Sequence, residues 1–364
     1  MASGKTWITS LVVLSLIVIL SCASTAHAWG VTGHQIVATI AQTQLHPDVR
    51  AHLCTILPPE QTAYRSFYPK EGAPHQHCHL APLSAWADRV HGQYPWASHL
   101  HYINPVQDDP PKHCTYGEKG WQDHGTGNVL EAILNYTSAL QTKSGYERDI
   151  ALRFLTHFMG DSHQPLHLTG RARGGNDVHV RFNGRFARLH SVWDSLLLND
   201  QIRDVANYTT RLPSTRIESA LLGRTYDSYI RWIMAEGLGQ AQGANVQPGW
   251  WHDEAESWTH CPEEKVTLGK DGKSNKTQEL HLSSIDDTDL PVCPYAWTKP
   301  MHPLVCSYAF ADPVPPVNQS NHGPLAELNV PEYAGRVHDH KIIHRQLARA
   351  GIRLAAVLNT ILLP

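Results

Sequence analysis

The sequence predicts a mainly α-helical protein that folds as a single domain. Apolar residues recur at intervals of three and four along three segments, as expected for helices with one buried face. These segments are residues 36–45, 150–158 and 342–358. Neither an internal repeat nor a Gly/Ser-rich linker divides the chain after residue 28. One small β-hairpin is expected at residues 178–186, where apolar residues alternate before the tight-turn pair Asn183-Gly184.

The composition is that of an ordered globular protein with a high histidine content. Of 364 residues, 41% are hydrophobic, 17% are charged and 25 are histidine. This apolar share is enough to bury a sizeable core, which argues against wholesale disorder. The formal net charge of −3 argues against binding a polyanion through a general basic field. Because neutral imidazole is a common metal ligand, the spacing of the histidines is the first question.

Residues 1–28 have the features of a secretory signal peptide. One positive charge precedes an apolar run over residues 11–20, and a small-x-small cleavage site ends at Ala28. The run is too short to span a bilayer, and no later stretch reaches the roughly 18 apolar residues that a membrane helix needs. We therefore expect a secreted protein with no membrane association, whose domain covers residues 29–364.

Six cysteines follow residue 28, and an even number in a secreted chain indicates disulfides. Six cysteines allow 15 pairings, and proximity in the sequence suggests one of them. The suggested pairs are Cys54–Cys78, Cys261–Cys293 and Cys114–Cys306. The alternative, a zinc site, is disfavoured because the chain has no Cys-x-x-Cys pair.

Two further features point to the protein surface. Residues 259–289 turn polar, with Lys, Asp, Gly and Ser, and are expected to form a surface insertion. Four sequons would accept N-glycans in a eukaryotic host, at Asn135, Asn207, Asn275 and Asn318.

The strongest chemical pattern is a repeated histidine–aspartate spacing. His157 and Asp161 lie four residues apart in a segment of helical periodicity, so both side chains project from one face. His190 and Asp194 repeat this spacing, and His167 is expected to turn back toward the same cavity after the first helix ends. Five nitrogen and oxygen ligands are too many for one structural zinc ion. The pattern therefore indicates a multinuclear metal site with open positions.

Ordinary ion pairs are the alternative for either spacing alone, because His and Asp four residues apart also form contacts on helix surfaces. Two such pairs, each beside apolar sequence, favour the metal site. Five other histidines have no partner at this spacing and are expected at the surface: His75, His77, His79, His124 and His163.

These residues belong to a longer series of motifs. The series begins at Trp29-Gly30-x-x-Gly33-His34 and ends near Ala350-Gly351-Ile352-Arg353-Leu354-Ala355. Between them lie Trp86-Ala87-Asp88, Leu100-His101-Tyr102, the block from His157 to His167, Gly174-Gly175-Asn176 and His190-x-x-x-Asp194. In content and order the series resembles the secreted zinc-dependent single-strand nucleases, or 3′-nucleotidases, of plants and moulds, relatives of zinc phospholipase C. The resemblance implies the helical fold of the phospholipase C and nuclease superfamily.

The resemblance also implies three zinc ions. The first would be held by Asp88, His101, His157 and Asp161, and the second by His167, His190 and Asp194. The third would use Asp161 as a bridge, together with His34 and the α-amino nitrogen and carbonyl oxygen of Trp29. An amine binds a metal only as a free, deprotonated terminus, so signal cleavage would create this ligand. The alternative for Trp29 is an ordinary core aromatic residue.

The activity implied by the resemblance is endonucleolytic hydrolysis of single-stranded RNA and DNA to 5′-phosphate products, with 3′-nucleotidase action on nucleotides. Asn176 is the expected base reader, because Gly174-Gly175-Asn176 matches the family's base pocket. For the two glycines, a turn that enters the hairpin is an equally good explanation. The alternative functions are a phospholipase C-like phosphodiesterase and a secreted zinc-binding homologue with impaired catalysis.

Two positions depart from the family pattern and flank its scissile phosphate. Members usually carry a basic residue, often Arg, where this chain has His91, and many carry Asp where this chain has Asn104. We expect His91, Asn104 and the bridging Asp161 to act in catalysis. Asn cannot act as a base, and His91 is positively charged mainly below about pH 6.5. Rate, pH optimum and substrate range are therefore expected to differ from those of the family.

Overall fold

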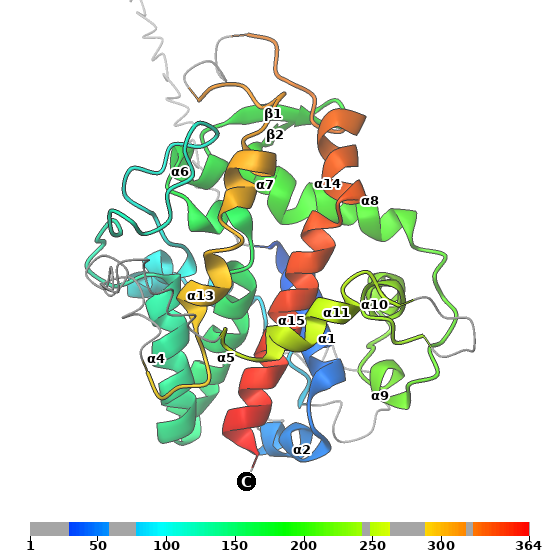
Figure 1. Ribbon diagram of the computed structural model, residues 1–364. Helices are drawn as coiled ribbons and strands as arrows, with labels where there is room; N and C mark the ends of the chain where they lie inside the picture. Colours follow the sequence, from blue (N-terminus) through cyan, green and yellow to red (C-terminus); the bar gives the residue numbers. More distant parts are fainter. Residues whose placement is uncertain (1–28, 58–77, 242–247, 263–287, 318–322, 364) are drawn as a thin grey trace, which may run out of the picture.

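The computed structural model describes residues 29–57, 78–241, 248–262, 288–317 and 323–363, and these are mainly helical, as predicted (Figure 1). The expected signal peptide, most of the 259–289 insertion and two sequon asparagines, Asn275 and Asn318, lie outside the described residues.

The described residues form helices of several kinds and two short strands. The α-helices are α1 (Val31–Gln44), α2 (Pro47–Ile56), α3 (Trp86–Arg89), α4 (Val129–Thr142), α5 (Gly145–Asp161), α6 (Ala172–Gly175), α7 (Leu189–Ser191), α8 (Leu197–Asp204), α9 (Thr215–Glu218), α10 (Asp227–Trp232), α11 (His252–Ala255), α13 (Pro294–Thr298), α14 (Arg336–Asp339) and α15 (Ile342–Leu362). Single 3₁₀ segments are Pro95–His101, Pro165–Leu168 and Glu256–Thr259, and π-helical turns are Val192–Leu196, Ile233–Gly237, Val305–Ala309 and Pro331–Gly335. The strands are β1 (His179–Phe182) and β2 (Arg185–Arg188).

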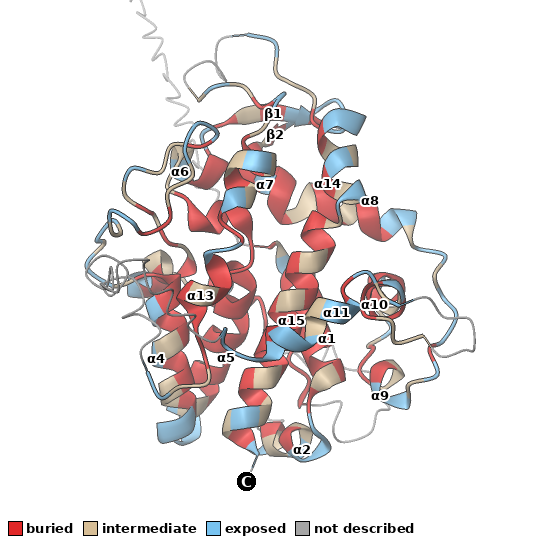
Figure 2. Cartoon of the chain, viewed as in Figure 1, coloured by how far each residue is buried: buried red, intermediate tan, exposed pale blue. Residues whose placement is uncertain are grey.

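Helices α1 and α15 run side by side through the middle of the protein (Figure 1). In α1, 10 of 14 residues are buried, so this helix has no broad solvent-facing side (Figure 2). A helix that is apolar or buried all round needs partners on every side. α1 and α15 are therefore the centre around which the other helices pack.

The interior contains two apolar clusters that share these two helices. In one cluster, Ile36 and Ile40 of α1 pack with the hairpin and with α8 and α10. In the other, Ala38 and Ala41 of α1 pack with α2, α4 and α5. α15 contributes Leu347 to the first cluster and other residues to the second. α1 and α15 therefore belong to both clusters and connect them.

The predicted hairpin is present as an antiparallel pair in which His179 faces Arg188 and Phe182 faces Arg185. Val178 and Val180 are fully buried, whereas Phe186 is 63% exposed. The buried residues alternate along β1 as the sequence predicts, and Asn183 has the positive φ of a tight turn.

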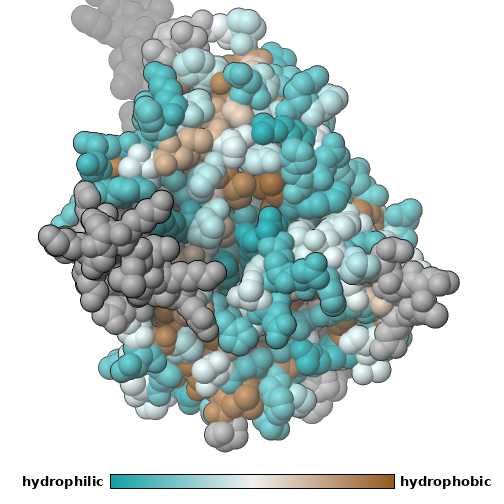
Figure 3. All heavy atoms as spheres, in the orientation of Figure 1, coloured by the Kyte–Doolittle hydropathy of each residue, from teal (hydrophilic) through white to brown (hydrophobic). Residues whose placement is uncertain are grey.

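All three disulfides suggested by sequence proximity are present: Cys54–Cys78, Cys114–Cys306 and Cys261–Cys293. The sequon asparagines Asn135 and Asn207 are both exposed, as a glycan acceptor must be. On the face drawn in Figure 3, hydrophilic colours predominate and apolar colour forms separate areas. Among the described residues, no helix is both long enough and apolar enough to cross a bilayer.

Gly351 allows the close approach of α15 to α1. A Cβ atom at Gly351 would lie 2.6 Å from Cγ2 of Ile40 and 2.9 Å from the carbonyl oxygen of Val37. The second contact is with backbone, which cannot move aside without shifting α1. Any larger residue at this position would push apart the two central helices.

We predict that Gly351→Ala lowers the free energy of unfolding by about 1–3 kcal/mol through overpacking, despite the better helix propensity of alanine. Gly335 is the matched control, because it is also helical and its nearest neighbour to an added Cβ, Pro331, lies at 3.7 Å. Gly335→Ala should leave stability unchanged or raise it. Urea denaturation of both variants measures the difference, and equal stability would contradict the proposed close packing.

Candidate metal centre

Helix α5 presents two polar side chains inside the protein. His157 and Asp161 are fully buried, and Nε2 of His157 lies 3.2 Å from Oδ2 of Asp161. The four-residue spacing therefore forms a pair on one helix face, as predicted. The pair faces the interior and is not a surface ion pair.

Helix α1 adds a third side chain, His34, to this pair. The ring of His34 stacks on that of His157 at 3.9 Å, and its Nε2 lies 3.2 Å from Oδ1 of Asp161. This contact requires a glycine, because a Cβ at Gly160 would lie 2.7 Å from Nδ1 of His34. α1 and α5 thus meet through polar rings as well as apolar packing.

Asp88 on α3 and His101 at the end of the 3₁₀ segment Pro95–His101 complete this group. Nδ1 of His101 lies 2.9 Å from Oδ2 of Asp161, and Oδ1 of Asp88 lies 3.3 Å from Nε2 of His157. Both added residues are buried. The structure thus brings together all four side chains that the sequence assigned to the first zinc ion, with His34 beside them.

A second group lies where the chain returns after α5. Nε2 of His190 lies 3.2 Å from Oδ2 of Asp194, and the ring of His167 lies 5.1 Å from that of His190. Potential ligand atoms of these three buried residues all lie within 4.8 Å of one another. His190 is on α7 and Asp194 on the π-helical turn that follows it, so their spacing is kept across a change of helix type.

Three of the histidines share one orientation. Nδ1 of His157 faces the carbonyl oxygen of Ser84 at 2.7 Å, that of His167 faces the carbonyl of His101 at 2.6 Å, and that of His190 faces the carbonyl of Gly174 at 2.6 Å. A carbonyl can only accept, so Nδ1 carries the proton and donates it. In the neutral ring Nε2 then has its lone pair toward the acidic residues, which is the usual arrangement of a metal-ligating histidine.

Burial and mutual contacts shift the pKa values of the acidic groups in the centre. Burial raises the pKa of Asp161, but contacts with His157, His101 and His34 reverse this and hold it well below its ordinary value. For Asp194, burial raises the pKa well above the ordinary value, because the Gln164 amide offsets only part of the cost. Two buried carboxylates therefore lie where neither solvent nor a Lys or Arg recorded in the described residues neutralises them.

The pKa values of the histidines in the centre are also shifted, by burial and by the neighbouring acids. Burial and, to a smaller extent, the neighbouring His157 lower the pKa of His34 to about 4. Burial also lowers the pKa of His157, but Asp161 and Asp88 outweigh it and raise the pKa well above its ordinary value. In the described part of the chain, Nε2 of His167 has no hydrogen-bond partner. Buried imidazole and carboxylate groups in such clusters fit divalent metal ions, zinc in particular.

Trp29 is fully buried and belongs to an apolar cluster, as expected if it is an ordinary aromatic residue of the core. The next residue, Gly30, donates its N–H to the carbonyl oxygen of Asp194 at 2.9 Å. The start of α1 is therefore held beside Asp194 of the second group. The ligand role of Trp29, with His34 and Asp161, stays a prediction.

The turn at Gly174-Gly175 has a clear structural role. Both glycines have positive φ, and a Cβ at Gly174 would lie 2.7 Å from the carbonyl oxygen of Leu166. The Asn176 side chain is buried and donates from Nδ2 to the carbonyl oxygen of Arg173. The interpretation as a turn is confirmed, and base reading by Asn176 stays a prediction.

The two positions that depart from the family have different neighbours. The ring of His91 lies 5.5 Å from that of His101. Nδ2 of Asn104 lies 3.2 Å from Nε2 of His124, which is partly buried. His91 is thus adjacent to the first group, whereas Asn104 contacts the flanking segment that carries His124.

Sequence reasoning was wrong about two of the five histidines expected at the surface, and His75 and His77 lie outside the described residues. His163 is fully buried, with Nδ1 facing the carbonyl of Met159 at 2.7 Å and Nε2 facing Arg353 at 2.8 Å. His79 is 2% exposed, and its Nε2 faces the carbonyl of Ala220 at 2.9 Å. Protein partners replace water around both rings, which removes the cost of burying them.

Sequence reasoning also missed residues that orient the candidate ligands. Nε2 of Gln164 donates to Oδ1 of Asp194 at 2.7 Å, and Gln164 is fully buried. Its place between two histidines in the Asp161–His167 block was the available signal. The carbonyl oxygen of Ser84, which orients His157, carries no side-chain signal at all.

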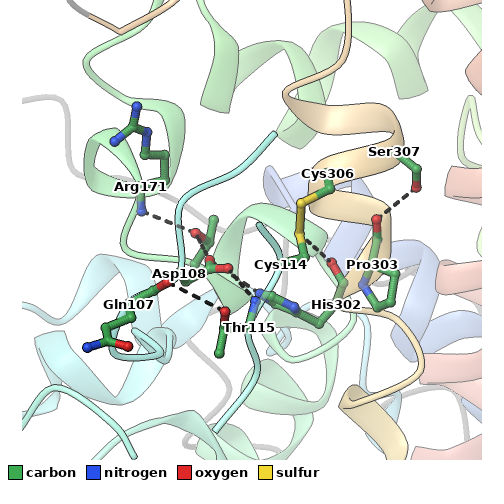
Figure 4. Close-up of a disulfide and its surroundings, with 10 residues drawn as sticks. Gln107, Asp108, Cys114, Thr115, Arg171, His302, Pro303, Cys306 and Ser307 are labelled. Atoms are coloured by element: carbon green, nitrogen blue, oxygen red, sulfur yellow. Dashed lines mark hydrogen bonds and ion pairs between the residues drawn. A yellow bond between two sulfur atoms is a disulfide. The ribbon is translucent and has the colours of Figure 1, made fainter. Parts of the chain in front are cut away.

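The segment that follows His167 is held from outside by a buried polar cluster beside a disulfide (Figure 4). Thr169 donates from Oγ1 to Oδ2 of Asp108 at 2.5 Å, and the same oxygen lies 3.3 Å from Nε2 of His302. The Cys114–Cys306 disulfide joins the two segments that carry Asp108 and His302. This connection fixes the chain two residues beyond a candidate ligand.

Comparison with known proteins agrees with this geometry. The family model described as "S1/P1 Nuclease" matches residues 29–363. Endonuclease 2 of Arabidopsis thaliana is 29% identical, over 94% of this chain and 93% of its own length. Nuclease S1 of Aspergillus oryzae is 27% identical over 94% of each chain, and nuclease P1 of Penicillium citrinum is 35% identical over 58% of this chain and 74% of its own. With a match that spans the whole described chain and includes every residue of the two His/Asp groups, the protein belongs to the S1/P1 nuclease family.

Proposed function

We propose that the protein is a secreted, zinc-dependent endonuclease that hydrolyses single-stranded RNA and DNA to 5′-phosphate products and also has 3′-nucleotidase activity. The observation that carries this proposal is the convergence of buried His and Asp side chains from α1, α3, α5 and α7 on two adjacent groups. Family membership supports the choice of nucleic acid as substrate.

Three zinc ions would account for the arrangement. The ligands we propose are Asp88, His101, His157 and Asp161 for the first ion, His167, His190 and Asp194 for the second, and Asp161, His34 and the terminal amine and carbonyl of Trp29 for the third. Bound zinc supplies Lewis acidity and local positive charge for attack of water on a phosphodiester. This local charge would allow a chain of net charge −3 to bind a polyanion.

The protein's own groups would orient the substrate around these ions. Because Nδ2 of Asn104 faces His124, its carbonyl oxygen remains to accept a hydrogen bond from a water or hydroxyl, although it cannot take up the proton. Asn176 would contact a nucleobase beside the second group, where the turn at Gly174 is already fixed by His190. Bases of single strands are unstacked and available for such contacts, which supports a single-strand preference.

Secretion is proposed on independent features. Three disulfides are typical of proteins that fold in an oxidising compartment. Exposed asparagines at two sequons, Asn135 and Asn207, could carry N-glycans there. The domain would then span residues 29–364, after removal of residues 1–28.

The direct test is digestion of single-stranded oligonucleotides by protein that begins at Trp29. We predict cleavage of both RNA and DNA to products with 5′-phosphate and 3′-hydroxyl ends, loss of activity after zinc chelation, and recovery on adding zinc. Phosphatidylcholine serves as the comparison substrate. Turnover of the lipid without cleavage of oligonucleotides would favour the phospholipase C-like alternative, and turnover of neither by zinc-loaded protein would favour the impaired homologue.

A second prediction concerns the terminal amine. Protein with one extra residue before Trp29 should bind two zinc ions instead of three, because its amine no longer lies where the Trp29 amine would. Zinc quantification by elemental analysis compares this protein with protein that begins at Trp29. Full occupancy in the extended protein would contradict the assigned third site while leaving the other two unaffected.

A third prediction concerns the contact between α1 and α5. Gly160→Ala should displace His34, because the added Cβ would lie 2.7 Å from Nδ1 and 2.9 Å from Cε1 of that ring. We expect loss of one zinc ion and at least about tenfold lower activity, since loss of orienting contacts alone typically costs 10–100-fold. Circular dichroism should show unchanged helix content. Gly335→Ala is the matched control and should keep full zinc and activity; the same result for Gly160→Ala would exclude His34 as a ligand.

A further inference from the structure

His91 lies close to two of the candidate metal ligands, Asp88 and His101. It follows Asp88 by three residues and lies two residues beyond the end of α3, a spacing that brings two side chains to the same side of a helical turn. One nitrogen of His91, one oxygen of Asp88 and one nitrogen of His101 all lie within 4.8 Å of one another. His91 therefore lies within the same cluster as two candidate zinc ligands.

The ring of His91 has an oxygen beside Nδ1, as three of the candidate ligands do. Its Nδ1 lies 3.5 Å from Oγ of Ser98, and its Nε2 is buried. His157, His167 and His190 also have an oxygen beside Nδ1, whereas His101 faces Asp161 with Nδ1. The Ser98 hydroxyl can accept a proton from Nδ1 of His91, and in that tautomer the lone pair is on Nε2, the atom through which the ring would bind a metal.

The side chain at position 91 decides whether this position can bind a phosphate or a metal ion. The Arg expected at this position by resemblance to the family has only N–H donors and stays protonated, so it can bind a phosphate but not a metal ion. Histidine is charged only in part of the pH range, whereas its neutral form is a strong ligand. Replacing Arg by His beside a buried carboxylate therefore exchanges an anion-binding group for a cation-binding one.

We propose that His91 is an additional nitrogen ligand of the metal ion that Asp88 and His101 hold. This inference rests on the proposed function, because it requires that ion to be present. Compared with a chain that has Arg at this position, the protein then fills one more coordination position of the first ion and binds that ion more tightly. The phosphate loses a contact that a basic residue would provide.

The experiment uses the full mature protein loaded with ¹¹³Cd in place of zinc. Correlation of cadmium with imidazole protons by NMR detects each histidine that is bonded to the metal. In the wild-type protein we expect such couplings from His34, His91, His101, His157, His167 and His190. A spectrum in which only the ring of His91 lacks a coupling would overturn the proposal, and a protein that takes up no cadmium would instead contradict the proposed function.

Variants assign the signal and measure its effect. His91→Ala and His91→Arg should each shift one of three cadmium resonances, remove one coupling and weaken binding of one zinc ion by at least about tenfold in a chelator competition. His99→Ala is the matched control, since His99 lies in the neighbouring segment and stacks on His124. It should leave all three resonances unchanged. Unchanged resonances and zinc affinity in both His91 variants would show that His91 is not a ligand.

Discussion

The buried carboxylate of Asp161 is the constraint on which the rest of the structure depends. It is fully buried and contacts histidines from α1, from the 3₁₀ segment before residue 102 and from its own helix. An unpaired ionised carboxylate is too costly to bury, so these contacts, with the metal ions they would hold, must form together. Helices that would otherwise pack by apolar area alone are thereby held in one relative position.

The motif at the start of α1 shows how that position is reached. A Cβ at Gly30 would lie 2.3 Å from Oγ of Ser195, and one at Gly33 would lie 2.6 Å from Cβ of Trp29. The two glycines therefore let Trp29 enter the core beside Asp194, and one turn later His34 faces Asp161. A single helix start thus connects both groups. Close packing explains the two glycines, and the proposed metal ligation would explain His34 and Trp29, so the motif has two physical reasons.

Features that depend on local periodicity could be predicted from the sequence. The His157–Asp161 pair, the hairpin turn at Asn183 and the C-terminal helix α15 each follow from spacing along the chain. Grouping of the distant residues Asp88 and His101 with this pair came from resemblance to a family, because spacing does not report contacts between segments. Gln164 and Gly160 were missed for the same reason: their partners lie 30 or more residues away in the sequence.

The excess of histidine has a second explanation in the packing of the core. Burial, together with nearby cations, holds the pKa of His163, His344 and His79 below its ordinary value, and for His344 a second histidine adds to the effect. These rings are therefore neutral near neutral pH. A neutral imidazole has one donor and one acceptor, and His163 uses both, donating to Met159 and accepting from Arg353. Nδ1 of His344 similarly lies 2.6 Å from the Tyr229 hydroxyl. Histidine thus has two roles in this protein. In the clusters around Asp161 and Asp194 its lone pair faces buried acids. Elsewhere it forms hydrogen bonds between segments of the core and is not part of a candidate metal site.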